Sequence, residues 1–194
     1  MEGTWVNGKI KGQGVYKLPD GSTYEGDWKD DFMHGQGKET MLNGDVYEGT
    51  YAHGMKNGKF KVTKADGSVF RGDFEDNEIR GDGNYQWANG NVYDGQWKRN
   101  KFDGKGKFTW ADGKEYNGDW RGGERHGSGS YKMEDGKTYI GKWKKNKQHG
   151  LGYIEDSNGK VLVYGVWDQG KMKNSFGKKK YDSLVAQKEG TDDE

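Results

Sequence analysis

A 23-residue period runs through this chain and constrains its fold more than any other feature. Glycine recurs at one position of the period: Gly12, Gly35, Gly58, Gly81, Gly104, Gly127 and Gly150. An aromatic ring recurs at another, in Trp5, Trp28, Tyr51, Phe74, Trp97, Trp120 and Trp143. Repeats of this length form quasi-linear arrays in which each unit contacts only its neighbours. Such an array offers an extended surface, which favours binding over catalysis.

Each repeat has the pattern of two strands joined by tight turns. Tyr24, Gly26 and Trp28 alternate with charged residues, which is typical of a strand with one aromatic and one polar face. Residues that tolerate positive φ, such as Gly8 and Asp31, mark the first turn. An Asp-Gly or Asn-Gly pair, a strong hairpin signal, marks the second. The sequence therefore predicts an all-β fold, an elongated, single-layer, twisted antiparallel meander of β-hairpin repeats with a short C-terminal helix.

The repeats start at residues 1, 24, 47, 70, 93, 116 and 139, with a partial one at 163, so that residues 1–177 form the array. Apolar residues make up only 29% of the chain, but aromatic residues make up 14%. The side chains of the aromatic residues, packed against glycine, must therefore form the core. We expect the two glycines of each second strand, such as Gly35 and Gly37, to let a neighbouring ring lie flat on the backbone.

Several kinds of site are excluded by the residues present. The chain has no cysteine and therefore no thiol nucleophile, disulfide or zinc–thiolate site. The first ten residues contain no apolar run, so no secretory signal is expected, and no stretch is long and apolar enough to span a membrane. This favours a cytoplasmic location. The carboxylates beside the aromatic residues recur on the polar face of each repeat and are interpreted as solvated: Glu25, Glu48 and Asp94.

Four histidines flank predicted turns, and we interpret them as locally hydrogen-bonded residues: His34, His53, His126 and His149. No metal, cofactor or catalytic residue is therefore predicted. Residues 1–97 carry a net charge of −5, residues 98–180 carry +10 and residues 181–194 carry −4. This polarity suits an acidic partner for the C-terminal half, or head-to-tail self-association. Nucleic acid is not expected as a partner, because the N-terminal half is acidic.

These patterns resemble the MORN repeat (membrane occupation and recognition nexus). The pattern Tyr-Glu-Gly-x-Trp followed by His-Gly-x-Gly is matched by Tyr24–Trp28 with His34–Gly37, and closely by Tyr116–Trp120 with His126–Gly129. Repeats three and four depart from it, since Phe60 replaces a glycine and the segment Phe70–Phe74 lacks Tyr, Glu and Trp. The resemblance implies a binding array of the kind found in ciliary and cytoskeletal scaffolds, in membrane-junction proteins, and beside the catalytic domains of some lipid kinases and lysine methyltransferases. The residues after Gly177 are too few for a catalytic domain, so we expect no enzyme.

Two candidate binding surfaces follow. A single sheet has no second layer, so the densest part of its aromatic face is a candidate groove for partner segments or another copy of the chain: Tyr85, Trp87, Trp97, Phe108, Trp110, Trp120 and Tyr131. A basic cluster is a candidate site for anionic lipid or an acidic partner: Lys142, Lys144, Lys145, Lys147, Lys171, Lys173, Lys178, Lys179 and Lys180. The first surface predicts a non-catalytic protein-binding scaffold in a larger cytoskeletal or ciliary assembly, such as an axoneme. The alternative is a peripheral membrane adaptor that binds anionic phospholipid through its basic C-terminal repeats.

Residues 178–194 form a tail, basic and then acidic. Tyr181, Leu184 and Val185 fall on one helical face, which predicts a short helix covering the C-terminal edge of the sheet. Residues 189–194 are predicted to be disordered. At the other end, the first strand is expected to have a bare edge that pairs with a neighbouring chain.

Overall fold

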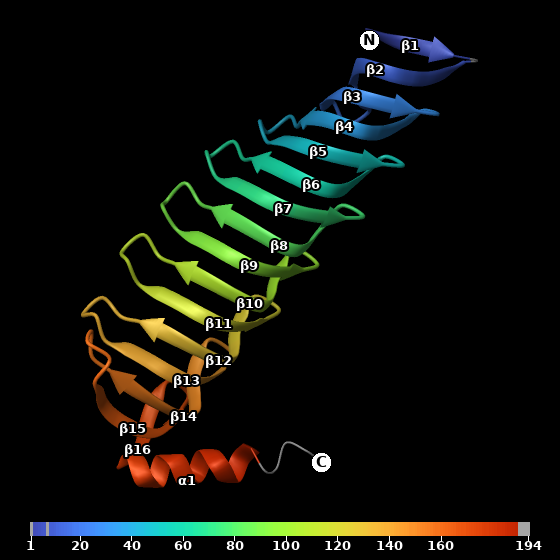
Figure 1. Cartoon of the computed structure of the whole chain (residues 1–194). Helices are drawn as coiled ribbons and strands as arrows, with labels where there is room; N and C mark the ends of the chain where they lie inside the picture. The colour runs from blue at the N-terminus through green and yellow to red at the C-terminus, as the bar shows by residue number, and fades with distance from the viewer. Residues whose placement is uncertain (1, 7, 190–194) are drawn as a thin grey trace. The chain divides into compact units, whose positions relative to one another are not determined.

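A computed structural model describes the backbone of residues 2–6 and 8–189, and the side chains of residues 8–187. It divides into two compact units, Met1–Lys101 and Phe102–Glu194. The predicted disorder of residues 189–194 is wrong for Glu189, which is the last residue of the C-terminal helix, and residues 190–194 lie outside the described residues. Within each unit, every strand pairs antiparallel with the next in the sequence (Figure 1). The predicted all-β antiparallel meander of hairpin repeats with a short C-terminal helix is therefore confirmed.

The first unit contains nine strands among its described residues: β1 (Glu2–Val6), β2 (Lys9–Lys17), β3 (Thr23–Lys29), β4 (Phe32–Thr40), β5 (Val46–Ala52), β6 (Met55–Thr63), β7 (Val69–Glu75), β8 (Glu78–Gln86) and β9 (Val92–Lys98). The described part of the second unit contains the rest: β10 (Lys101–Thr109), β11 (Glu115–Arg121), β12 (Glu124–Lys132), β13 (Thr138–Lys144), β14 (Lys147–Glu155), β15 (Val161–Asp168), β16 (Lys171–Phe176) and α1 (Lys178–Glu189). The first residue of β10 is the last of the first unit.

The tight turns have the geometry that the sequence predicts. At the β7–β8 turn, Asp76 and Asn77 have φ of 48° and 68°, and at the β9–β10 turn Arg99 and Asn100 have φ of 50° and 63°. Two consecutive positive φ angles define the hairpin turn whose twist matches that of the strands. The Asn side chain also links successive hairpins, since Asn100 Oδ1 accepts the Ile79 N–H at 2.7 Å.

Positions are counted below from the start of each 23-residue repeat. The glycine at position 12 does not lie under a ring, so this part of the prediction is wrong. Gly35 and Gly127 have φ of 61° and 58° and form a β-bulge at which the register of the hairpin shifts. In the second and sixth repeats the aspartate at position 4 holds the bulge, as Asp119 Oδ2 accepts the Ser128 N–H at 2.8 Å. A Cβ atom at Gly127 would meet that carboxylate and not a ring.

The glycine at position 14 has the predicted role. A Cβ atom at Gly129 would lie 2.5 Å from Tyr116 Oη, and one at Gly152 would lie 2.7 Å from Tyr139 Oη. Each tyrosine ring therefore rests on the backbone of the next strand, which only glycine permits. The rings form a buried ladder along one face of each unit, and its most buried members are Tyr24, Tyr51, Phe70, Tyr93, Tyr116 and Tyr139.

The helix α1 packs on a face of the sheet. The Tyr181 ring lies 4.9 Å from the Tyr164 ring and 6.0 Å from the Tyr153 ring, measured between centroids. Tyr153 and Tyr164 are cross-strand partners on β14 and β15, and they lie on the side opposite to the ring ladder. Tyr181, Leu184 and Val185 are half-buried, as predicted for one helical face. The contacts of Tyr181 thus lie on the face of β14 and β15, whereas the sequence predicted the outer edge.

Candidate partner-binding face

The aromatic face of each unit has a buried floor. In the second unit, the Tyr116 ring lies 5.1 Å from Trp120 and 5.2 Å from Trp143, in edge-to-face contacts. Tyr116 Oη donates a hydrogen bond to the Asp119 carbonyl at 2.8 Å, and Trp120 Nε1 donates one to the Gly106 carbonyl at 3.0 Å. Burial, followed by the nearby Asp119 charge, raises the pKa of Tyr116 far above its ordinary value. The floor of the second unit is therefore neutral at Tyr116, and the buried polar atoms of Tyr116 and Trp120 are paired.

The predicted partner-binding residues fall into two layers. Trp97 and Trp120 are each 7% exposed and belong to the buried floor. The other five are half-buried and form an outer layer on the same face: Tyr85, Trp87, Phe108, Trp110 and Tyr131. Tyr85, Trp87 and Trp97 lie in the first unit, and the other four lie in the second.

The outer layer consists of rings that contact one another. In the first unit, the Tyr85 and Trp87 centroids are 4.3 Å apart. In the second unit, Phe108 and Trp110 are 4.6 Å apart, and Trp110 meets Tyr131 edge-on at 5.8 Å. These side chains alternate along their strands with residues of the polar face, so they stand on the floor beside the Tyr and Trp ladder.

Arg125 lies in this outer layer, and the sequence reasoning missed it. Its guanidinium carbon lies 4.6 Å from the Trp143 centroid, 5.5 Å from Tyr131, 5.7 Å from Tyr116 and 5.9 Å from Trp110. Its Nη2 donates to the Asn146 carbonyl at 2.9 Å, and burial lowers the pKa of Arg125. A signal was available, because position 10 faces the rings and carries apolar or neutral residues in most other repeats, such as Ile10, Ile79 and Phe102.

The first unit contains a charged cluster on its aromatic face. Lys56 Nζ lies 2.5 Å from Glu39 Oε2 and 4.5 Å from the Tyr47 ring centroid. Tyr51 Oη also donates to the Glu39 carboxylate, at 3.4 Å. Next to this cluster is a hollow of about 270 Å³. Phe70 and Phe74 line it at the positions that Tyr and Trp occupy in most repeats, so the departure of repeat four from the pattern leaves this space open.

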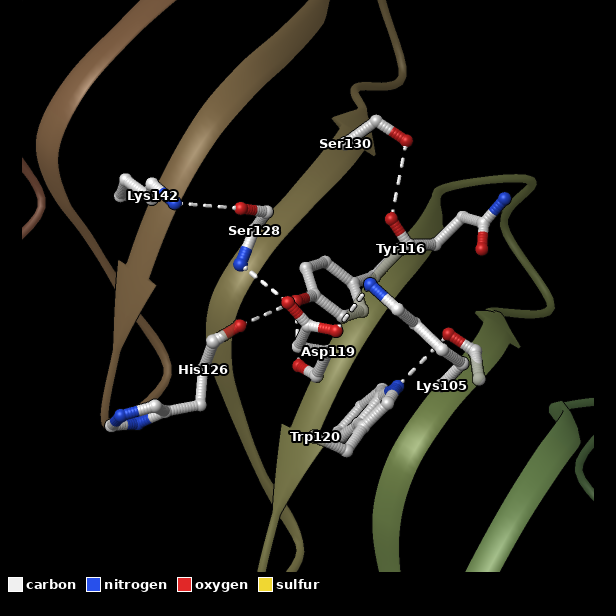
Figure 2. A network of polar contacts seen from close by, with 10 residues as sticks. Lys105, Tyr116, Asp119, Trp120, His126, Ser128, Ser130 and Lys142 are labelled. Atoms are coloured by element: carbon white, nitrogen blue, oxygen red, sulfur yellow. Dashed lines mark hydrogen bonds and ion pairs between the residues drawn. The ribbon is translucent and has the colours of Figure 1, made fainter. Parts of the chain in front are cut away.

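The opposite face is polar. Figure 2 shows its network in the second unit, where Lys105 Nζ lies 2.5 Å from Asp119 Oδ1 and Lys142 Nζ donates to Ser128 Oγ at 3.0 Å. Burial would raise the pKa of Asp119, but the hydrogen bonds from Lys105 and from the Ser128 N–H outweigh it, and the pKa is lowered. The carboxylate is therefore an ionised structural acceptor. This arrangement brings no second carboxylate to Asp119 for acid–base chemistry.

The nine lysines of the basic cluster are all exposed. They lie on several elements: Lys142 and Lys144 on β13, Lys145 in the turn, Lys147 on β14, Lys171 and Lys173 on β16, and Lys178, Lys179 and Lys180 at the start of α1. Three have a polar partner, as Lys142 bonds Ser128, Lys147 bonds Gln169 Oε1 at 3.1 Å, and Lys178 pairs with Asp182 at 2.6 Å. Among the described residues, no group of three or more His, Asp or Glu side chains gathers as a metal site.

Comparison with protein-family models gives a match that covers most of the chain. The family model of the MORN repeat matches seven consecutive segments, residues 2–23, 24–46, 47–69, 70–92, 93–115, 116–138 and 139–161. No curated protein sequence matches the chain significantly. Within the described residues, the single helix α1 is too short and too polar to cross a membrane.

Two solved structures show a distant likeness. The TCP domain of SAS-4 (dCPAP) from Drosophila melanogaster, in complex with a proline-rich motif of Ana2 (dSTIL), is 11% identical over 86% of this chain and 90% of that chain, with a TM-score of 0.45. The wild-type TCP10 domain of Danio rerio CPAP is 13% identical over 79% of this chain and 78% of that chain, with a TM-score of 0.38. Scores this low do not establish a common fold.

Proposed function

Because the chain belongs to the MORN repeat family, we propose that it is a non-catalytic protein-binding scaffold whose aromatic face holds segments of partner proteins. The family's repeats bind proteins and membranes. Their occurrence in cytoskeletal and ciliary scaffolds supports placing this chain in such an assembly.

The outer layer of rings carries this proposal. The core of each unit is already complete in the buried floor, where Trp97 and Trp120 are only 7% exposed. Trp87 and Trp110 pack on that floor and are half-buried. In the unbound chain part of their apolar surface stays in contact with water, which is unfavourable in free energy. Aromatic side chains in this state are typical of the energetic centre of protein interfaces. A bound segment would bury them.

The test compares two folded double variants in affinity capture followed by mass spectrometry. Trp87→Ala/Trp110→Ala removes one outer ring from each unit, and Lys144→Ala/Lys173→Ala is the matched control on exposed, partnerless side chains of the described region. We expect the aromatic variant to lose proteins that the wild type and the lysine variant both retain. Equal capture by all three would contradict the proposal. Co-pelleting with polymerised tubulin then tests the cytoskeletal setting.

A second candidate function is peripheral membrane binding through the basic cluster. The observation that favours it is the exposure of all nine lysines, in a segment, residues 98–180, with a net charge of +10. Each lysine near an anionic membrane surface contributes about 1 kcal/mol of attraction. Several together would hold the chain on a bilayer of phosphatidylserine or phosphoinositide.

Vesicle co-sedimentation separates the two functions. Vesicles of phosphatidylcholine alone are compared with vesicles that also contain phosphatidylserine and phosphatidylinositol bisphosphate. If the membrane function holds, pelleting requires the anionic lipid, falls with added salt, and is lost in Lys144→Ala/Lys173→Ala while Trp87→Ala/Trp110→Ala still pellets. If no vesicle pellets the wild type, this second function is wrong.

A further inference from the structure

Lys56 and Arg125 are equivalent residues of the two units. Both stand at position 10 of their repeats, three repeats apart. Each is the cross-strand partner of the position-5 ring, as Lys56 pairs with Tyr51 and Arg125 pairs with Trp120. Each places a cation against aromatic rings on the same face of its unit. What differs is the source of negative charge.

Lys56 has a counterion built into its own unit. Glu39, at position 16 of the preceding repeat, lies 2.5 Å from Lys56 Nζ, with side-chain exposures of 7% and 16%. A buried or half-buried cation is costly unless a charged and hydrogen-bonded partner offsets its lost hydration. In the first unit, Glu39 and the rings meet this need.

Arg125 has no such counterion. The residue equivalent to Glu39 is Phe108, which contributes a ring and no charge. Within the described part of the chain, Arg125 contacts four rings and the Asn146 carbonyl, and no carboxylate pairs with it. Cation–π contacts and one carbonyl offset part of the lost hydration. The guanidinium retains donors that these contacts do not use.

We propose that Arg125 receives the carboxylate of an Asp or Glu side chain from a bound protein segment, whose adjacent apolar residue packs on Trp110 and Tyr131. The proposal rests on the proposed function and names the chemistry of its partner. A planar guanidinium binds a carboxylate through two parallel hydrogen bonds, and the surrounding rings keep competing water away. The net charge of +10 over residues 98–180 adds long-range attraction for an acidic segment.

The test selects peptides from a displayed random dodecamer library on four full-length proteins. They are the wild type, Trp110→Ala, Arg125→Gln and Phe108→Glu. The last variant places a carboxylate in the second unit at the position that Glu39 occupies in the first. This carboxylate should pair with Arg125 and so take the place of the carboxylate of a bound segment. Thermal unfolding is measured for each variant, and Arg125→Lys provides a milder change if Arg125→Gln does not fold.

We expect the wild type to enrich peptides in which Asp or Glu is next to an apolar residue. Arg125→Gln and Phe108→Glu should both lose this acidic preference. In a selected peptide, replacing the acidic residue by its amide should weaken binding to the wild type about tenfold or more, and should barely change binding to Arg125→Gln.

Three results would overturn the inference. If peptides are enriched through Trp110 but without an acidic residue, or equally by Arg125→Gln, the carboxylate is wrong while the binding face stands. If a phosphoserine peptide binds tighter than its Glu counterpart, the preferred anion is a phosphate. If no enrichment depends on Trp110, both the inference and the proposed function fail.

Discussion

The two units use the same backbone but fill their aromatic faces differently. In the second unit, Tyr116, Trp120 and Trp143 form an uninterrupted ladder of rings resting on glycine. In the first, the ladder is broken where a buried carboxylate, Glu39, and a lysine, Lys56, form an ion pair beside a hollow of about 270 Å³.

The difference shows which repeat positions the backbone requires and which it leaves open. The positive φ at position 12 is found in both units, at Gly58 and at Gly127, because the bulge depends on it. Position 14 is glycine where the position-1 ring covers it, as Tyr24 covers Gly37 and Phe70 covers Gly83, and in the third repeat Phe60 occupies it instead. The fold therefore tolerates a second packing solution, which places a buried ion pair on the aromatic face of the first unit.

Phe60→Ala should have the largest effect on the free energy of unfolding. It removes the side chain that replaces glycine at position 14 in the first unit. Phe60 is 4% exposed and packs on Tyr51 at 5.2 Å and Phe74 at 4.9 Å. Its truncation leaves a cavity that the rigid rings cannot fill, at a cost of about 3–5 kcal/mol. Hydrogen exchange should show the loss in the first unit. Phe32→Ala, at a side chain 52% exposed, is the control and should change little.

Glu39→Gln should cost slightly less, about 3 kcal/mol, because it leaves the Lys56 cation buried without a counterion. In the second unit, Arg125→Met removes the cation equivalent to Lys56, which has no carboxylate partner among the described residues, and should change the free energy of unfolding by about 1 kcal/mol or less. Denaturant unfolding of both variants measures the contrast. Equal losses would show that the two cations are compensated alike, and would remove the basis for assigning Arg125 to a partner.

Gly129→Ala sharpens the comparison at position 14, where this repeat of the second unit requires the glycine that the third repeat, in the first unit, replaces with Phe60. The new Cβ atom would lie 2.5 Å from Tyr116 Oη, and that ring is fully buried. We expect a loss of about 2 kcal/mol from overpacking. Gly177→Ala is the matched control, since a Cβ atom there meets nothing within 4 Å. If Gly129→Ala lowers the free energy of unfolding by less than Gly177→Ala does, the tyrosine rings can move to accommodate the new Cβ atom.

The sequence predicts the fold of both units well, but it identifies only some of the residues on their aromatic faces. The period, the Asp-Gly turns and the alternation at Tyr24–Trp28 fix the strands, because each depends on local backbone chemistry. The role of Gly35 could not be separated from that of Gly37, since a bulge and a ring contact both select glycine. Trp97 and Trp110 were indistinguishable for a similar reason, because the burial of a ring depends on the neighbouring repeat. Arg125 was missed because its aromatic neighbours come from different repeats.

Asp45 gives a smaller effect, which depends on pH. The hydrogen bond from Lys64 is the main reason that the pKa of Asp45 lies below its ordinary value, against the opposing effect of burial. A folded pKa below the unfolded one adds stability above about pH 4, which is lost as the pH falls through the folded pKa. Asp45→Asn should therefore cost about 1 kcal/mol at pH 7, and the cost should shrink as the pH falls towards 2. Unfolding temperatures at the two pH values measure it, and a loss that persists in acid would point to packing and not charge.

The smallest effect is expected where the two units agree. Lys59 Nζ lies 2.6 Å from Asp73 in the first unit, and Lys105 Nζ lies 2.5 Å from Asp119 at the equivalent place in the second. The lysine side chains are 80% and 74% exposed, so water screens both pairs. Lys59→Ala and Lys105→Ala should each change the free energy of unfolding by about 0.5 kcal/mol or less, and 0.5 M salt should reduce even that. Parallel denaturant titrations of the two variants measure the difference. A large loss in one unit alone would show that the units differ on their polar faces too, whereas equal small losses confine the difference to the aromatic faces, where Glu39 and Phe108 distinguish them.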